Sequence, residues 1–360
     1  MSIRISPSNF SISSNGFKME NIRISAGSAS LLGLQSLKME TLPTCVHLLQ
    51  YSTLGCSANC AFCPQARQSI IGNKKWLSRV SWPRFPWNSV KTRIKEAFKK
   101  GICLRVCLQT VLCNSWIDDM IYTARDLLQD ETVPMSIAMT PVNRQTMEVL
   151  HDIGVDRIGI ALDASSKGIF SKIKGKKISG PFRWETHLDA LHEALEVFGK
   201  GRVTTHLIVG LGETEKQFTR LMQEIHEQDI TLGLFAFTPV RGTALSLHPR
   251  PTIECYRRMQ LARFLITRGF KKVDDFSFNK ITGKITGWGM SRAKIEQIVH
   301  ESKGRMFETT GCPGCNRPFY TSKPGGTIYN HPAPLSNQDI TSAIQILFQE
   351  EIHDGDELDC

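Results

Sequence analysis

Three cysteines stand close together in the segment Gly-Cys-Ser-Ala-Asn-Cys-Ala-Phe-Cys-Pro-Gln-Ala-Arg, which begins at Gly55. Cys56, Cys60 and Cys63 are separated by three and then by two residues. Thiolates at this spacing in a loop can bind three irons of a 4Fe–4S cluster and leave the fourth iron open to a small molecule. A structural zinc site takes four ligands, and no fourth cysteine or histidine follows nearby. The spacing therefore favours a reactive iron–sulfur cluster over a zinc knuckle.

A second cysteine pair, Cys312 and Cys315, lies far along the chain with Pro and Gly between the two thiols. A Cys-x2-Cys pair places two ligands on a tight turn, and both zinc and iron–sulfur centres use such pairs. From the residues alone, both metals stay open at this second pair.

Composition narrows the class of protein that carries these thiols. The chain has 360 residues, of which 41% are hydrophobic, and its formal net charge is +10. This composition excludes a disordered or collagen-like chain, and no apolar run is long enough to suggest a membrane helix. Eleven cysteines in a chain without a signal-peptide pattern favour reduced thiols, so we expect a cytoplasmic protein. The positive charge indicates either an acidic partner or an ordinary solvated surface.

Short apolar runs alternate with amphipathic stretches from Cys45 onward. The pattern predicts parallel β/α units and favours a partial (β/α)6 barrel of the TIM-barrel type. Its strands are expected at residues 46–51, 102–110, 135–140, 157–163, 203–210 and 232–238. Its helices are expected at residues 90–100, 116–128, 144–153, 184–198, 214–228 and 253–268, with two more near 292–301 and 340–349.

The second expected strand has two different faces. Leu104, Val106 and Leu108 alternate with Cys103, Arg105, Cys107 and Gln109. A packed barrel would fill its interior with bulky aliphatic side chains. The polar face therefore predicts an interior reaction chamber, with Cys107 pointing into it.

The alternation divides the chain into three parts. We expect an N-terminal arm at residues 1–40, without regular structure, and the barrel at residues 41–275. A C-terminal extension at residues 276–360 carries the Cys-x2-Cys pair.

The first cysteine motif, with Phe62 before its last cysteine and a strand before it, resembles the radical S-adenosylmethionine (radical SAM) enzymes. The resemblance covers about residues 42–270 and implies that the open iron binds the amino and carboxylate groups of S-adenosylmethionine. One electron then cleaves this cofactor to a 5′-deoxyadenosyl radical. The resemblance also implies cofactor contacts from Phe62, Gln109, Asp163, Ile208, Gly210 and Phe237.

The cysteine run up to Ala66 and the run Val-Gly-Leu-Gly-Glu-Thr that begins at Val209 are similar to biotin synthase and its relatives. The run Gly-Cys-Pro-Gly-Cys-Asn-Arg-Pro-Phe-Tyr from Gly311, the later Pro-Gly-Gly, and Leu-Ser-Arg-Val-Ser-Trp-Pro from Leu77 together resemble the subunits of two-component, archaeal-type lipoyl synthases. This implies a radical SAM sulfurtransferase that inserts sulfur into an octanoyl chain. The implied partners are a lipoyl carrier protein, such as an H-protein-like domain, a second synthase subunit and a reductant such as ferredoxin. Neither a membrane nor a nucleic acid is expected as a partner.

Sulfur insertion of this kind implies a second, auxiliary 4Fe–4S cluster that donates sulfur. Its implied ligands are Cys312 and Cys315, with Cys107 as the third, while Cys45, Cys103, Cys113 or a residue other than cysteine compete for that place. Biotin synthase holds its second cluster with cysteines on strands two, three and five, but Ala138 and Thr204 occupy two of those places here.

Two other functions stay open. One is a biotin-synthase-like sulfurtransferase or a methylthiotransferase that acts on a small molecule or a tRNA. The other is a non-catalytic iron–sulfur or zinc protein that scaffolds a partner.

Overall fold

The computed structural model describes residues 19–71, 74–129, 133–318, 320–322 and 325–349. Its main feature is an eight-stranded sheet with the strand order β10-β9-β8-β7-β6-β2-β1-β5. These strands are β1 (Asn21–Ile24), β2 (Cys45–Leu49), β5 (Arg84–Pro86), β6 (Arg105–Gln109), β7 (Met135–Met139), β8 (Arg157–Ile160), β9 (Val203–Val209) and β10 (Thr231–Ala236). Two small hairpin sheets pair β3 (Trp76–Leu77) with β4 (Val80–Ser81) and β11 (Ser277–Phe278) with β12 (Ile285–Gly287).

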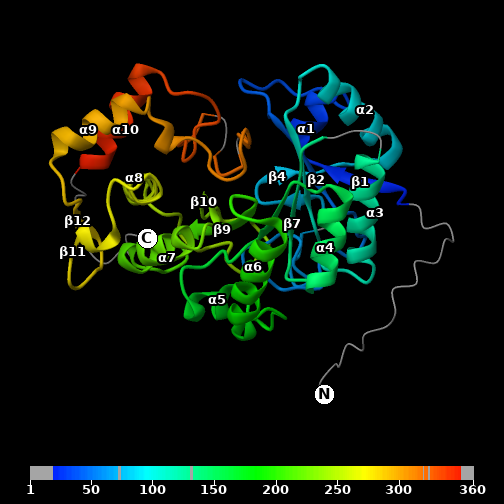
Figure 1. The fold of residues 1–360 in the computed structure, drawn as a ribbon, viewed down its shortest axis with the longest axis horizontal. Coiled ribbons are helices and arrows are strands. Elements are labelled where there is room, and N and C mark those ends of the chain that lie inside the picture. The colour runs from blue at the N-terminus through cyan, green and yellow to red at the C-terminus, as the bar shows by residue number, and fades with distance from the viewer. Residues whose placement is uncertain (1–18, 72–73, 130–132, 319, 323–324, 350–360) are drawn as a thin grey trace.

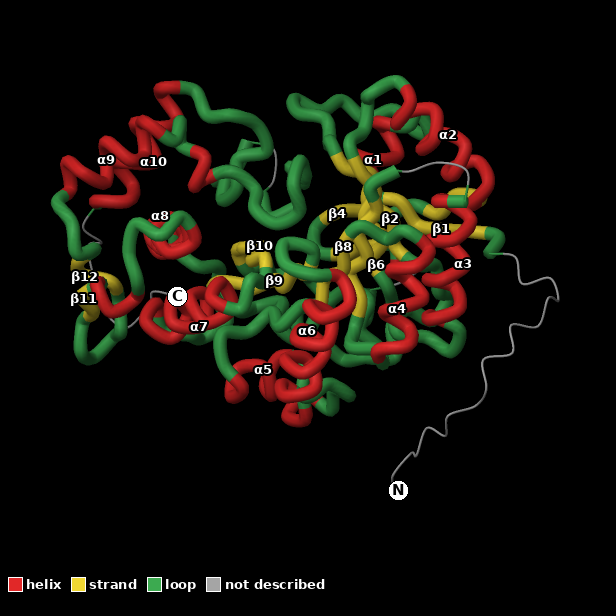
Figure 2. The backbone as a smooth tube through the Cα atoms, in the orientation of Figure 1, coloured by secondary structure: helices red, strands yellow, loops and turns green. Residues whose placement is uncertain are grey.

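Strand β2 and strands β6 to β10 run parallel to one another. Parallel neighbours need crossover connections, and the connections here contain helices that lie around the strands (Figures 1 and 2). Among the described residues, β10 does not pair back with β2, so the sheet stays open at one side. This arrangement confirms the predicted partial barrel with a mostly parallel sheet.

Most helices bury apolar residues in one large core together with the strands, whereas α5 packs in a smaller separate cluster. Among the described residues, none of them has both the length and the apolar character needed to cross a membrane. Their bounds are α1 (Ala26–Leu31), α2 (Trp87–Lys99), α3 (Trp116–Leu128), α4 (Arg144–Ile153), α5 (Lys167–Ile173), α6 (Trp184–Phe198), α7 (Glu215–Glu227), α8 (Ile253–Thr267), α9 (Arg292–Glu301) and α10 (Asn337–Phe348).

The predicted helices agree with the structure more closely than the predicted strands. Helices α3, α4, α6 and α9 begin and end where the sequence placed them. Strand β6 begins at Arg105, three residues later than predicted, because Cys103 leaves the strand and packs among apolar side chains of the core. Helix α5 was not predicted, because seven residues are too few to show a clear apolar periodicity.

The expectation of an irregular N-terminal arm was wrong for residues 21–31, which form β1 and α1. Strand β1 pairs antiparallel with β2 on one side and with β5 on the other, and Ile22 and Ile24 are fully buried. A four-residue strand shows too little alternation to be recognised without its partners. Residues 1–18 of the predicted arm lie outside the described residues.

The C-terminal extension spans the open side of the sheet between β10 and β2. The backbone N–H of Leu234 on β10 donates to Thr310 Oγ1 over 2.8 Å, and the N–H of Thr44, just before β2, donates to Asn316 Oδ1 over 2.9 Å. The segment that carries Cys312 and Cys315 therefore bridges β10 and the start of β2.

A buried ion pair ties this extension to the barrel helices. Arg258 on α8 donates from Nε to Glu215 Oε1 on α7 over 2.7 Å, and Glu215 Oε2 accepts the backbone N–H of Ile285 over 2.7 Å. Both charged side chains are buried. Removing one member of such a pair leaves the other charge without compensation.

We therefore expect Glu215→Gln to lower the stability of the metal-free chain by about 3–5 kcal/mol. Urea unfolding followed by circular dichroism measures this effect as a lower urea midpoint. The control is Glu296→Gln, which removes the exposed pair between Arg292 and Glu296 on α9 and should leave the midpoint unchanged. Equal midpoints for Glu215→Gln and the control would show that the buried pair does not hold the helices together.

Candidate functional site

One cavity of about 250 Å³ lies among the parallel strands, and all six of them contribute side chains to its wall. Arg105, Cys107 and Gln109 of β6 line it, as the alternation of that strand predicted, while Val106 and Leu108 are buried in the surrounding apolar core. The interior of the partial barrel is thus a chamber with polar and thiol groups on its wall.

The first cysteine motif forms the loop that follows the carboxyl end of β2. The loop folds on itself, because the N–H of Cys63 donates to the Cys60 carbonyl over 3.0 Å and the N–H of Cys56 donates to the Gln65 carbonyl over 2.9 Å. The N–H of Leu112, just beyond β6, donates to Cys56 Sγ over 3.2 Å. An N–H aimed at sulfur favours the thiolate and is a known influence on iron–sulfur potentials.

Burial raises the pKa of all three thiols, and the pKa of Cys63 rises to about 12. The charge of Cys63 further raises the pKa of Cys60, and the charge of Cys56 further raises the pKa of Cys63, because like charges repel. Without a cation these thiols are protonated at neutral pH. A bound metal centre replaces those protons and compensates the thiolate charges, so the loop fits a cationic ligand.

The separation of the sulfurs distinguishes a cluster from a zinc ion. Two sulfurs on one tetrahedral zinc lie about 3.8 Å apart. Among the described residues, groups of three donor atoms within 4.8 Å of one another do not include Cys56, Cys60 and Cys63. At least two of these sulfurs are therefore farther apart than two ligands of one zinc ion.

Five of the six side chains predicted to contact the cofactor line the same cavity: Phe62, Gln109, Asp163, Ile208 and Phe237. The sixth, Gly210, is not among the lining residues. Its φ of +95° is in the left-handed region, and a Cβ there would lie 2.7 Å from Pro251. The structure thus gives Gly210 a role in the turn after β9, because only glycine fits this conformation and this close packing.

Asp163, which follows β8, also has a positive φ of 64° and bonds to Lys174. Lys174 Nζ donates to Asp163 Oδ2 over 2.7 Å and to the Ala161 carbonyl over 2.8 Å, and both side chains are largely buried. Lys174 is buried, whereas the neighbouring Lys176 and Lys177 are exposed. Lys174 orients the Asp163 carboxylate at the cavity wall.

Cys312 and Cys315 line the cavity together with Cys107, as the alternation and the Cys-x2-Cys spacing suggested. Their loop lies near the amino ends of β2 and β6, where Arg105 Nη1 donates to the Pro313 carbonyl over 3.4 Å. The first cysteine loop follows the carboxyl end of β2. The two thiol groups consequently approach one cavity from opposite ends of the strands.

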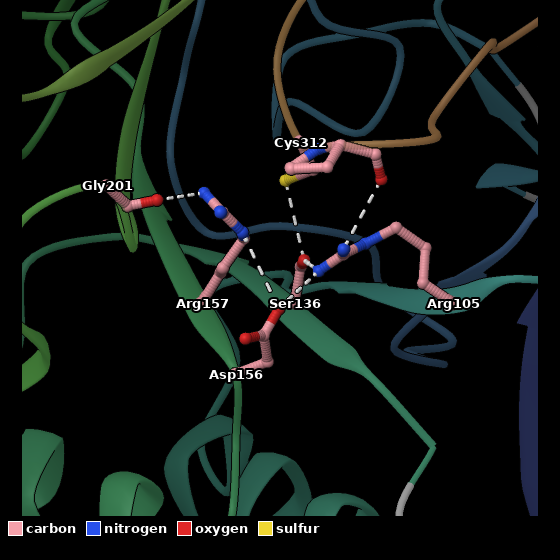
Figure 3. A network of polar contacts seen from close by, with 7 residues as sticks. Arg105, Ser136, Asp156, Arg157, Gly201 and Cys312 are labelled. Atoms are coloured by element: carbon pink, nitrogen blue, oxygen red, sulfur yellow. Dashed lines mark hydrogen bonds and ion pairs between the residues drawn. The ribbon is translucent and has the colours of Figure 1, made fainter.

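A polar network holds the Cys312 loop in this position (Figure 3). Arg105 donates to Ser136 Oγ and pairs with Asp156 over 2.9 Å, while Ser136 Oγ lies 3.4 Å from Cys312 Sγ. Arg157 pairs with the same Asp156 oxygen over 3.5 Å and donates to the Gly201 carbonyl. Because Arg105 is 5% exposed, its charge acts on Cys312 with little screening by water.

The cavity is also lined by two residues of β2 that were not among the predicted site residues. Cys45 was weighed only as one of several competing thiols, and His47 was not considered. They stand two residues apart on one strand, which is the spacing of side chains that share a face. That spacing could have indicated them, but the predicted strand began at Val46 and left Cys45 outside the alternation.

The fold and the cysteine loop define an iron–sulfur protein built on a partial barrel. Residues 51–225 match the Radical SAM superfamily, and this part of the chain is a radical SAM domain. The solved structure of HydG, a maturase of the [FeFe]-hydrogenase, shares the fold with a TM-score of 0.50 and 13% sequence identity. The match covers 67% of this chain and 57% of HydG.

Two curated proteins show sequence similarity. Biotin synthase of Buchnera aphidicola subsp. Acyrthosiphon pisum is 26% identical over 186 residues, which cover 51% of this chain and 50% of that protein. The ribosomal protein uS12 methylthiotransferase RimO of Thermus thermophilus is 34% identical over 87 residues, which cover 24% of this chain and 20% of that protein. The chain thus spans half or less of the curated relatives that it matches.

Replacing Cys56, Cys60 or Cys63 with Ala should prevent the first cluster from forming, because each thiol holds one iron. We expect the iron content after anaerobic reconstitution to fall by about four per chain. Iron and sulfide assays measure this loss. Cys103→Ala is the matched control, since Cys103 is buried in the core and does not line the cavity. An unchanged iron content in the three variants would contradict this assignment.

Arg105→Met should loosen the Cys312 loop, because the change removes its contacts with Ser136, Asp156 and the Pro313 carbonyl. We expect faster backbone hydrogen exchange across residues 311–316 of the metal-free chain, read by mass spectrometry. Arg144→Met, which removes exposed contacts on α4, serves as the control and should not alter this segment. If both variants exchange alike there, the network does not position the loop.

Proposed function

We propose that this chain is a radical SAM sulfurtransferase that inserts sulfur into an octanoyl chain carried on a lipoyl carrier protein, as one subunit of a two-component lipoyl synthase. The observation that supports the proposal most is the single cavity with thiol groups at both ends. Cys63 lines it at one end, and Cys107, Cys312 and Cys315 line it at the other. Radical formation and sulfur donation need two centres that reach the same substrate.

When bound, the first cluster and S-adenosylmethionine supply a radical that removes hydrogen from a saturated carbon. The chain's own side chains then have to shield the reacting carbon from water. Ala138, Ile208 and Phe235 give the cavity an apolar part of its wall, and Phe237 is 2% exposed. These side chains suit an extended alkyl chain.

The polar groups of the cavity lie where the cofactor is expected. Gln109 at the end of β6 and the Asp163 carboxylate held by Lys174 line the wall. In the proposed function Gln109 binds the methionine part of S-adenosylmethionine, and Asp163 binds its ribose hydroxyls. Phe62, beside Cys63, packs against the bound cofactor.

The positive net charge of the chain supports an acidic carrier protein as its partner. Lipoyl carrier domains tend to be acidic, and this chain has a formal net charge of +10. Lys176 and Lys177 are exposed on the loop after α5 and offer cations to such a surface. Opposite charges steer the encounter of two proteins and weaken as salt is added.

The similarity to biotin synthase and RimO supports a second candidate, a sulfurtransferase or methylthiotransferase with a different substrate. Ala138 and Thr204 line the cavity at the two places where the resemblance to biotin synthase calls for cluster cysteines. This difference argues against a second cluster held as in biotin synthase.

Incubation with S-adenosylmethionine, a reductant and an octanoyl-lysine peptide tests the proposal. We expect mass spectrometry to show the addition of one sulfur to the peptide by the chain alone or together with its partner subunit, and no change in dethiobiotin. Formation of 5′-deoxyadenosine without sulfur in the peptide, with the partner present, would refute the octanoyl assignment. Sulfur in dethiobiotin instead would establish the second candidate.

Two variants separate the steps. Cys60→Ala should abolish 5′-deoxyadenosine formation, whereas Cys312→Ala should leave that formation intact and stop sulfur insertion. Full sulfur insertion by Cys312→Ala would show that the centre at Cys312 is not the donor.

A further inference from the structure

Three segments at the carboxyl ends of the parallel strands carry cations without acids. Residues 51–75 follow β2, residues 164–184 follow β8 and residues 237–253 follow β10. These segments contain no Asp or Glu, whereas they contain three, six and two Lys or Arg residues respectively. The chain as a whole has 34 acidic residues beside 44 Lys and Arg. The positive net charge is therefore concentrated on these three segments.

Backbone hydrogen bonds place the three segments side by side around the first cysteine loop. Ala61, which lies between two cysteines of that loop, donates its N–H to the Ile173 carbonyl over 2.6 Å. Its own carbonyl accepts the N–H of Leu245 over 3.1 Å. The N–H of Ile70 donates to the Gly242 carbonyl over 3.1 Å. The three segments therefore form one surface together with the cysteine loop.

The exposed residues of this surface, the cluster-loop face, are Arg67, Ile70, Lys172, Arg241 and Leu247. Ile70 is 87% exposed and Leu247 is 97% exposed, so neither side chain is held by packing within the chain. Among the described residues, the three cations form no ion pair. Exposed apolar side chains among unpaired charges of one sign have the composition of a protein–protein interface with an apolar centre and a charged rim.

A radical SAM domain needs one electron from outside the chain each time S-adenosylmethionine is cleaved. The cavity of about 250 Å³ is far too small to admit a protein donor. On the cluster-loop face, the N–H of Arg67 donates to the Ala58 carbonyl over 2.9 Å, and Ser57, beside Cys56, is exposed. A protein bound to this face is therefore separated from the cysteines by little more than the loop backbone.

We propose that the cluster-loop face docks an acidic electron-transfer protein, such as a ferredoxin, that reduces the first cluster. In this step the reduced iron–sulfur centre of the donor loses one electron, and the first cluster gains it. Opposite charges speed the encounter, and electron-transfer complexes need only a small contact area. The inference rests on the radical SAM domain and goes beyond the proposed function, because it does not depend on the octanoyl substrate.

The position of the face favours an electron donor over the acyl carrier as its occupant. A carrier has to pass its acyl chain into the cavity, but the five exposed residues of the face are not among those that line the cavity. An electron donor has only to come close to the cluster. Lys176 and Lys177, which the proposed carrier contact uses, follow Lys172 in the chain and stay unchanged in the test.

Binding tests the face without turnover. The reconstituted full chain is titrated with an acidic ferredoxin by calorimetry, as wild type and as Lys172→Glu, Arg241→Glu and Leu247→Asn. We expect Kd to rise roughly tenfold in each charge reversal and to rise also in Leu247→Asn, and wild-type binding to weaken as salt is added. Lys100→Glu is the matched control, because Lys100 is exposed before the amino end of β6 and its reversal changes the net charge equally.

Electron delivery gives a second readout. Formation of 5′-deoxyadenosine, without octanoyl peptide, is driven either by reduced ferredoxin or by dithionite, a small reductant that needs no docking surface. Lys172→Glu and Arg241→Glu should slow the ferredoxin-driven reaction roughly tenfold and leave the dithionite-driven reaction unchanged.

Three results would overturn the proposal. The first is a wild-type chain that does not bind ferredoxin, and the second is a set of variants that behave like Lys100→Glu. The third is equal slowing with both reductants, because the residues would then act on the cluster and not on the donor. Since octanoyl peptide is absent, each of these results is independent of the proposed substrate.

Discussion

The open side of the sheet is the constraint on which the rest of the structure depends. Parallel strands that do not close into a full barrel leave backbone groups without strand partners on the open side, and buried groups of this kind have to find other partners. On β10, Leu234 finds one in Thr310, and Thr44 before β2 finds one in Asn316. The segment that supplies both of these partners also carries Cys312 and Cys315. The same segment therefore bridges β10 and the start of β2 and brings Cys312 and Cys315 to the cavity wall.

A second constraint is the burial of charge around the cavity. Arg105 and Lys174 are each about 5% exposed, and each is held by a carboxylate, Asp156 and Asp163 respectively. Buried ion pairs of this kind cost desolvation and add little stability by themselves. Arg105 also holds the loop of Cys312, and Lys174 orients the Asp163 carboxylate at the cavity wall.

Much of the fold could be predicted because the relevant signals are local. Apolar residues recur every three to four positions in α3, α4, α6 and α9, so even their ends could be placed. The short β1 could not be predicted, because its stability comes from pairing with β2 and β5 and not from its own four residues. Helix α5 and the hairpin of β3 and β4 are short elements of the same kind.

The sequence by itself determined the class of site, because three thiols within eight residues form one loop whatever the rest of the chain does. It also determined which side chains of β6 face inward, since alternation is a property of a single strand. Only the tertiary structure decided that Cys45 and His47 meet Cys315, that Lys174 is buried against Asp163, and that Gly210 packs against Pro251. Each of these contacts joins separate elements, and their meeting depends on how strands, loops and the C-terminal extension pack in space.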